Sequence, residues 1–333
     1  MPELRRDPIV GRWVIIATER AKRPTDYKSE KIAARAGSVC PLCPGHEDKT
    51  PPAVLVYREG DSPQPSAPWT VRVVPNKYPV LKIEGDIDRR GEGLYDKMNG
   101  IGAHEVIVET SSHGKQLADL DPPAVESVLR AYSDRLLDLA RDVRFRYGMV
   151  FKNHGAAAGA TLEHSHSQLI ALPVVPAAIS AEMQGAERYY EFKERCIFCD
   201  IIRTELAEGK RVIYENDGFV VTAPYAPRFP FETWILPKHH SAAFEHADRR
   251  ELAGLAAALR TALRKLNVAL ECPPYTYALH TAAFGQAHLS SYHWHIEIMP
   301  TRTRVAGFEL GSWFYINATP PEDAAAFLRE LAV

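Results

Sequence analysis

The segment His164-Ser165-His166-Ser167-Gln168 carries side chains that can perform phosphoryl chemistry. In an extended strand, residues two apart point to the same face, so His164, His166 and Gln168 project together. A neutral imidazole is a nucleophile toward phosphorus, and its attack on the α-phosphate of a nucleoside diphosphate sugar expels a sugar 1-phosphate. That leaving group needs no proton, because its second pKa is about 6, and the Gln168 amide can donate to a phosphoryl oxygen in the transition state. The segment predicts nucleotidyl transfer through His166.

The loop before this strand, NHGAAAGATLE, consists mainly of small residues. Gly155 and Gly159 leave backbone N–H groups free to approach a phosphate. An isolated H-x-H strand is also typical of two buried or metal-bound histidines without a catalytic task. The glycine-containing loop and Gln168 favour the catalytic interpretation.

Two C-x-x-C pairs, each followed by separate histidines, predict two tetrahedral zinc sites. A redox pair or two buried thiols is the alternative for either pair, and His104 and His239 compete with His113 and His240 as ligands. Zinc at the first site would be structural, holding His164 and so aiming His166. The proposed ligands are Cys40, Cys43, His113 and His164 in the first set and Cys196, Cys199, His240 and His293 in the second.

The same pattern of C-x-x-C, lone histidine and H-x-H occurs twice, which indicates an internal repeat. His113 precedes His164 by 51 residues, and His240 precedes His293 by 53. In each copy the pattern predicts a strand, a helix, a strand, a loop and the histidine-bearing strand. The expected helices begin after Asp121 and after Asp248, whose side chains can cap them.

Alternating apolar residues in the strands indicate mainly antiparallel pairing. The fold class expected is therefore α+β, with helices packed on one side of each half-sheet. We expect one half over residues 1–175, with the nucleophile and a zinc site, and another over 190–333, with the second metal site. Residues 60–68 are expected to form a surface loop that lengthens the first half. In the second half Glu297 stands where the first has Gln168, and a carboxylate repels phosphate, so this half is expected to be a scaffold.

The chain has 333 residues and a formal charge of -2, so no global basic field exists to hold nucleic acid or an anionic membrane. The sequence shows no long apolar run of the kind that a signal peptide or a spanning helix requires. We expect a cytoplasmic location. The cysteines do not suit a secreted disulfide framework, because such frameworks stabilise small domains with poor cores.

Several segments resemble the galactose-1-phosphate uridylyltransferase family. RRDPIVGRWVIIATERAKRP is similar to the family's opening segment, VRVVPNKYPVL to its base-binding segment, HSHSQ to its active-site motif and GFELG to its sugar-binding end. The resemblance implies two tandem histidine-triad-like halves, a homodimer, and ping-pong transfer of a uridylyl group from UDP-glucose to galactose 1-phosphate through His166. Its implied substrate contacts are Arg20 and Arg23 at the nucleotide, reached from the partner subunit, Asn76 and Tyr78 at the nucleoside, Asn153, Gly159, Thr161 and Gln168 at the phosphates, and Phe308 and Glu309 at the hexose.

Glu163 and Ser167 stand where the common family motif has proline and glycine. This variant also resembles a plant-type ADP-glucose phosphorylase branch, so the alternative function is phosphorolysis of ADP-glucose or adenylyl transfer through the same His166. A hydrolase is disfavoured by Gln168, and a zinc-stabilised nucleotide-binding module is the non-enzymatic alternative. Some family members build the second metal site from a glutamate and three histidines, for which the candidates here are Glu182, His280, His293 and His295.

Overall fold

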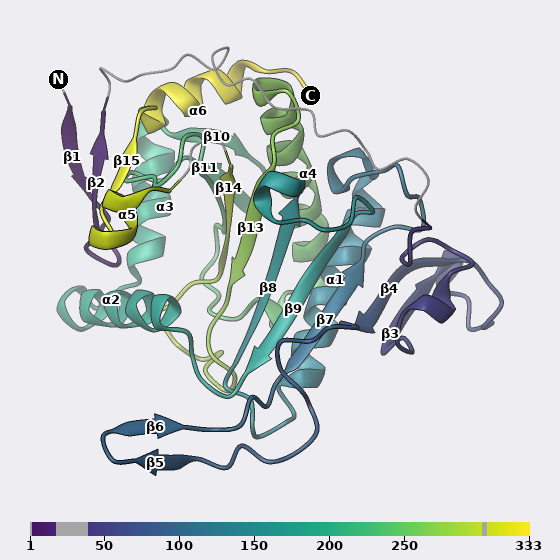
Figure 1. Cartoon of the computed structure of the whole chain (residues 1–333). Helices are drawn as coiled ribbons and strands as arrows, with labels where there is room; N and C mark the ends of the chain where they lie inside the picture. The colour runs from purple at the N-terminus through teal and green to yellow at the C-terminus, as the bar shows by residue number, and fades with distance from the viewer. Residues whose placement is uncertain (1, 18–38, 302–304) are drawn as a thin grey trace.

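A computed structural model of the chain describes residues 2–17, 39–301 and 305–333. Its centre is one sheet of ten strands in which every pair of neighbours is antiparallel (Figure 1). In order across the sheet the strands are β10 (Val212–Glu215), β11 (Phe219–Thr222), β12 (Thr233–Pro237), β14 (His295–Pro300), β13 (Tyr275–His280), β8 (Tyr147–His154), β9 (His166–Leu172), β7 (Ala103–Val108), β4 (Trp69–Pro75) and β3 (Leu55–Arg58).

The order of these strands shows the internal repeat. Reading inward from each edge, the first half contributes β3, β4, β7, β9 and β8, and the second contributes β10, β11, β12, β14 and β13 in the same sequence. The halves join where β8 and β13 pair, with Lys152 opposite Tyr277. The predicted α+β fold of two tandem halves is confirmed.

Helices α1 (Pro122–Leu139) and α4 (Arg249–Leu270) connect equivalent strands in the two halves and lie side by side on one face of the sheet (Figure 1). Asp121 caps α1 by accepting from Ala124 N at 3.0 Å, and Asp248 caps α4 by accepting from Glu251 N at 2.8 Å, as predicted. The apolar stripes of both helices enter one common core. Its helical members include Val125, Val128, Leu129, Tyr132, Leu136, Leu252, Leu255, Leu259, Leu263 and Leu266.

The opposite face differs between the halves. In the second half it is covered by α2 (Ala177–Lys193) and α3 (Ile197–Glu208), which pack with Val220, Trp234 and Leu236 in a separate apolar cluster. The expectation of helices on only one side was therefore wrong for the second half. In the first half this face carries the loop with Cys40 and Cys43.

The remaining elements lie around the large sheet. A small sheet joins β1 (Glu3–Arg6), β2 (Trp13–Ile16) and β15 (Tyr315–Asn317), with α5 (Gly307–Ser312) beside it and α6 (Pro321–Glu330) against β10. The hairpin β5 (Arg90–Glu92) and β6 (Tyr95–Lys97) projects from the body (Figure 1). This hairpin, rather than residues 60–68 alone, lengthens the first half. Short 3-10 turns are η3 (Glu47–Lys49), η4 (Glu59–Asp61), η5 (Leu117–Asp119), η6 (Ala156–Ala158) and η7 (Phe244–His246). No helix in the described ranges is long and apolar enough to cross a membrane.

Candidate active site and metal centres

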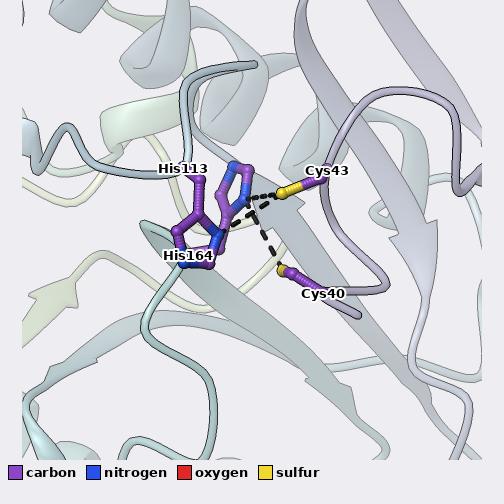
Figure 2. A group of neighbouring side chains, drawn as sticks. All are labelled: Cys40, Cys43, His113 and His164. Atoms are coloured by element: carbon purple, nitrogen blue, oxygen red, sulfur yellow. Dashed lines mark hydrogen bonds between the residues drawn. The ribbon is translucent and has the colours of Figure 1, made fainter. Parts of the chain in front are cut away.

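The first set of predicted metal ligands converges beside the start of β9 (Figure 2). Cys43 Sγ lies 3.3 Å from His113 Nδ1 and 3.5 Å from His164 Nδ1, and Cys40 Sγ lies 3.8 Å from His164 Nδ1. His164 is fully buried, and its Nε2 donates to the Thr110 carbonyl at 2.7 Å. That bond places the proton on Nε2 and turns the Nδ1 lone pair toward the thiols, as a metal ligand requires.

The second set repeats this geometry. Cys199 Sγ lies 3.5 Å from His240 Nδ1 and 3.7 Å from His293 Nδ1, with Cys196 in the same group. His293 Nε2 donates to the Pro237 carbonyl at 2.9 Å. The hydrogen bond from the Cys196 thiol is the largest influence that lowers the pKa of Cys199, to about 3, which gives the thiolate form that binds metals.

The two competing histidines have other partners. His239 Nε2 lies 2.5 Å from Glu251 Oε1, and His104 Nε2 lies 2.8 Å from Gln168 Oε1. The structure therefore brings His113 and His240, not their competitors, to the cysteines. Both groups have the donor chemistry that fits a tetrahedral zinc ion, and the tautomers of His164 and His293 suit it.

His166 is the first residue of β9, on the face opposite α1. Its Nδ1 donates to the His164 carbonyl at 2.8 Å, so that the unprotonated Nε2 is the nitrogen with a free lone pair. The side chain is 8% exposed. Burial lowers the pKa of His166, and the nearby ammonium of Lys152 lowers it further. The imidazole is therefore neutral at neutral pH and has one available nucleophilic atom.

A charged network that was not predicted from the sequence lies beneath β9. Lys152 Nζ donates to Glu109 Oε2 at 2.6 Å, to Ser165 Oγ at 3.1 Å and to the His166 carbonyl at 3.0 Å. Lys152 and Glu109 are each 1% exposed. Tyr132 on α1 joins the network through bonds to Glu109 and to Ser167 Oγ. A lysine on the core-facing side of an apolar strand was the available sequence signal. The network holds the backbone that carries His166.

The loop between β8 and β9 contains two glycines with positive φ. Gly155 and Gly159 have φ of 79° and 91°, a region that favours glycine. Asn153 Oδ1 accepts from Thr276 Oγ1 at 3.2 Å, and a Cβ atom on Gly159 would lie 3.5 Å from Asn153 Nδ2. Thr161 is exposed at the end of the loop. These residues lie on the segment that leads into His164.

The other expected substrate contacts are more dispersed. Asn76 Nδ2 lies 3.2 Å from His104 Nε2, the atom that also contacts Gln168, whereas Tyr78 is 81% exposed. Phe308 and Glu309 lie on α5 beside the small sheet, where Glu309 Oε2 accepts from Ala306 N. The structure does not bring these two residues to His166 within the chain. Arg20 and Arg23 lie outside the described residues.

The equivalent position in the second half is a closed ionic cluster. Glu297 Oε2 accepts from Arg228 Nη2 at 2.5 Å, and His280 Nδ1 bonds to Glu182 Oε2 at 3.0 Å. Burial opposes the charge of His280, but Glu182 and Glu297 raise its pKa to about 9. His295 Nε2 lies 3.9 Å from both glutamates, and His293 belongs to the cysteine group. The alternative ligand set of one glutamate and three histidines is thus divided between two clusters.

Comparison with known proteins agrees with this architecture. Residues 1–176 match the family description "Galactose-1-phosphate uridyl transferase, N-terminal domain", and residues 182–332 match its C-terminal domain. An ADP-glucose phosphorylase from Arabidopsis thaliana is 39% identical over all of this chain and 93% of its own, and a Thermotoga maritima galactose-1-phosphate uridylyltransferase is 29% identical over 100% and 99%.

Two solved structures extend the similarity to the whole fold. A crystal structure of an ADP-glucose phosphorylase from Arabidopsis thaliana with bound ADP-glucose is 38% identical, with a TM-score of 0.85 and complete coverage of both chains. A structure of a uridylyltransferase is 28% identical, with a TM-score of 0.77 and coverage of 99% and 97%. The repeated fold and these relatives define an enzyme of the nucleotidyltransferase class. The chain belongs to the galactose-1-phosphate uridyl transferase family.

Proposed function

We propose that the protein transfers a nucleoside monophosphate between phosphate acceptors through a covalent adduct on His166. The observation that carries the proposal is the hydrogen bond from His166 Nδ1 to the His164 carbonyl, which leaves Nε2 as a neutral nucleophile. Nε2 attacks the α-phosphorus of a nucleotide sugar and forms a P–N bond. The bond from that phosphorus to the bridging oxygen breaks, and the sugar 1-phosphate leaves with the electron pair.

In the second half-reaction an acceptor phosphate oxygen attacks the same phosphorus and the P–N bond breaks. The imidazole becomes positively charged in the adduct, and the His164 carbonyl, which accepts from Nδ1–H, stabilises that charge. One phosphoanhydride replaces another, so the cycle is nearly balanced in energy. Water must be excluded while the adduct exists.

The remaining site residues have roles in binding. We assign Gln168, Asn153, Gly159 and Thr161 to the phosphates, where the amide hydrogens and the loop N–H groups meet the non-bridging oxygens. Further contacts proposed from the family resemblance are Asn76 and Tyr78 at the nucleoside, Arg20 and Arg23 at the nucleotide, and Phe308 and Glu309 at the hexose.

For the donor we propose ADP-glucose, with inorganic phosphate as acceptor and ADP and glucose 1-phosphate as products. The support is that a relative named ADP-glucose phosphorylase is 39% identical, whereas a relative named galactose-1-phosphate uridylyltransferase is 29% identical. Glu163 and Ser167 in the active-site motif point the same way. The second candidate is UDP-glucose with galactose 1-phosphate as acceptor, which the family descriptions favour.

Two zinc ions per chain complete the proposal. The first would be held by Cys40, Cys43, His113 and His164, and the second by Cys196, Cys199, His240 and His293. Closed Cys2His2 shells are typical of structural zinc. Zinc at the first site would fix the ring of His164 and, through its carbonyl, the orientation of His166. The thiolates of both sites suit a reducing compartment, and we propose the cytoplasm.

We further propose a homodimer and a division of roles between residues 1–175 and 190–333. The first half supplies the nucleophile, and the second supplies a scaffold with the sugar-binding end. The exposed apolar side chains of α5 and of the projecting hairpin support an interface between copies. They are Phe308 and Leu310 on α5, Trp313 directly after it, and Leu94 and Tyr95 in the hairpin. In a dimer, α5 of one subunit would reach the hexose bound to the other.

Release of glucose 1-phosphate tests the donor assignment. The purified protein is incubated with ADP-glucose or UDP-glucose, each with inorganic phosphate or galactose 1-phosphate as acceptor. We expect the fastest release from ADP-glucose with inorganic phosphate. Faster release from UDP-glucose with galactose 1-phosphate would favour the second candidate, and release of a free nucleoside monophosphate without an acceptor would indicate a hydrolase.

A further inference from the structure

His104 is a buried histidine that contacts Gln168. It lies on β7 next to β9 (Figure 1), is 8% exposed, and pairs through its backbone with Ile170. Its side chain reaches along the sheet to Gln168, where Nε2 lies 2.8 Å from the amide oxygen Oε1. A buried imidazole in contact with Gln168, the side chain assigned above to the phosphates, can control the direction of its amide.

The hydrogen bonds of the ring determine its tautomer. The backbone N–H of Val80 donates to His104 Nδ1 at 3.3 Å, so Nδ1 is the acceptor. A neutral imidazole has one protonated nitrogen, which is therefore Nε2. The Nε2–H group donates to Gln168 Oε1 and fixes which end of the Gln168 amide faces His104.

The consequence is that the NH2 group of Gln168 points away from His104 and is available to a phosphoryl oxygen. Asn76 also contacts His104. The backbone N of Asn76 donates to the His104 carbonyl at 2.7 Å, and Asn76 Oδ1 accepts from Tyr78 N at 2.9 Å. Asn76 Nδ2 lies 3.2 Å from the protonated Nε2, and two donors make no bond with each other.

We propose that His104 is a positioning residue for nucleotidyl transfer, which orients the Gln168 amide with its NH2 group toward the phosphoryl oxygens. The inference rests on the proposed transfer through His166. Without the donor at Nε2, the Gln168 amide is free to turn over and present its oxygen to the phosphate. An amide oxygen repels the negative phosphoryl group, so the amide then opposes the transition state.

A double-mutant cycle tests this role. His104→Leu removes the donor, and Gln168→Leu removes the group that it orients. We expect His104→Leu to slow single-turnover formation of the His166 adduct about 10- to 100-fold, a fraction of the loss typical of removing a transition-state donor. In the Gln168→Leu protein, His104→Leu should slow adduct formation less than about twofold, because the effects of two residues that act through one group are not additive. The inference would be overturned if His104→Leu slowed adduct formation as much in the Gln168→Leu protein as in the wild type. It would also be overturned if His104→Leu alone formed the adduct at nearly the wild-type rate.

Conservative variants separate orientation from general disruption. Glutamine can place an amide N–H near the position of imidazole Nε2, whereas asparagine is too short to reach Gln168. We expect His104→Gln to recover to within about fivefold of wild type and His104→Asn to be as slow as His104→Leu. Equal rates for the two amide variants contradict the proposal, and this comparison still decides the matter if His104→Leu does not fold. An adduct absent from wild type would refute the transfer function itself, whereas a normal adduct with additive variants refutes only the role of His104.

Discussion

Removing the ammonium group of Lys152 should destabilise the protein more than any ordinary surface change. The group is 1% exposed and makes an ion pair of 2.6 Å with Glu109, which is equally buried. Lys152→Met leaves that carboxylate without its partner in the core, and breaking a buried pair from one side costs about 3–5 kcal/mol. The variant also loses the donor to the His166 carbonyl. We therefore expect a large fall in the urea midpoint and slower adduct formation.

The pH dependence of the loss identifies its cause. In the wild type, burial alone would raise the pKa of Glu109, but the Lys152 ion pair and hydrogen bonds hold it below its ordinary value. Without Lys152, burial dominates and the folded pKa of Glu109 rises above the unfolded one. The folded variant then binds the extra proton, so its stability is best retained in acid and lost as pH rises through the raised pKa. The difference from wild type should be larger at about pH 8 than at about pH 5.5.

Urea unfolding at both pH values, with zinc content matched, is the assay. Adding Glu109→Gln to Lys152→Met removes the unpaired buried charge and should restore most of the lost stability at the higher pH. Arg249→Met is a matched control, because that side chain is 85% exposed and faces Glu126 across 3.4 Å. An equal loss at both pH values, or no recovery in the double variant, would refute the electrostatic reasoning.

Three further predictions concern the pH dependence of adduct formation, the zinc ligands and the N-cap of α1. The rate of adduct formation should remain constant from neutral pH down to 6.5, the ordinary pKa of histidine, and fall only in more acidic solution, because burial and Lys152 lower the pKa of His166; a midpoint above 6.5 contradicts this. Cys43→Ser and Cys199→Ser should each remove one zinc by elemental analysis, but only the first should strongly slow adduct formation, since only that site contains His164; equal slowing contradicts the assignment. Asp121→Ala should cost about 1 kcal/mol of unfolding free energy and Asp121→Asn much less, because the N-cap of α1 is lost only in the first.

Much of this architecture was predictable because it depends on local patterns. Alternation in the strands, the caps at Asp121 and Asp248 and the spacing of the histidines were sufficient for the repeat and for the two ligand groups. Whether His240 or His239 lies at the second metal site was not predictable, because the side chains of adjacent residues differ only in the direction in which they point. The contact of His239 with Glu251 on α4 is a tertiary contact.

The supporting residues were the least predictable part of the site. His104 and Gln168 are 64 residues apart, and Glu109 and Lys152 are 43 apart, so each pair meets only through the register of the sheet. The covering of the second half by α2 and α3 also depends on tertiary packing. A charged residue at a core-facing strand position, such as Lys152, was the one local signal of such a network.

Transfer through His166 can be tested by intact-mass measurement after brief exposure of the protein to ADP-glucose or UDP-glucose. We expect one nucleoside monophosphate per chain, release of glucose 1-phosphate in equal amount, and localisation of the adduct to His166 by peptide mapping. The adduct should be absent from His166→Gly and should disappear when an acceptor phosphate is added. Turnover without any adduct, an adduct on another residue, or an unchanged adduct in His166→Gly would contradict transfer through this imidazole.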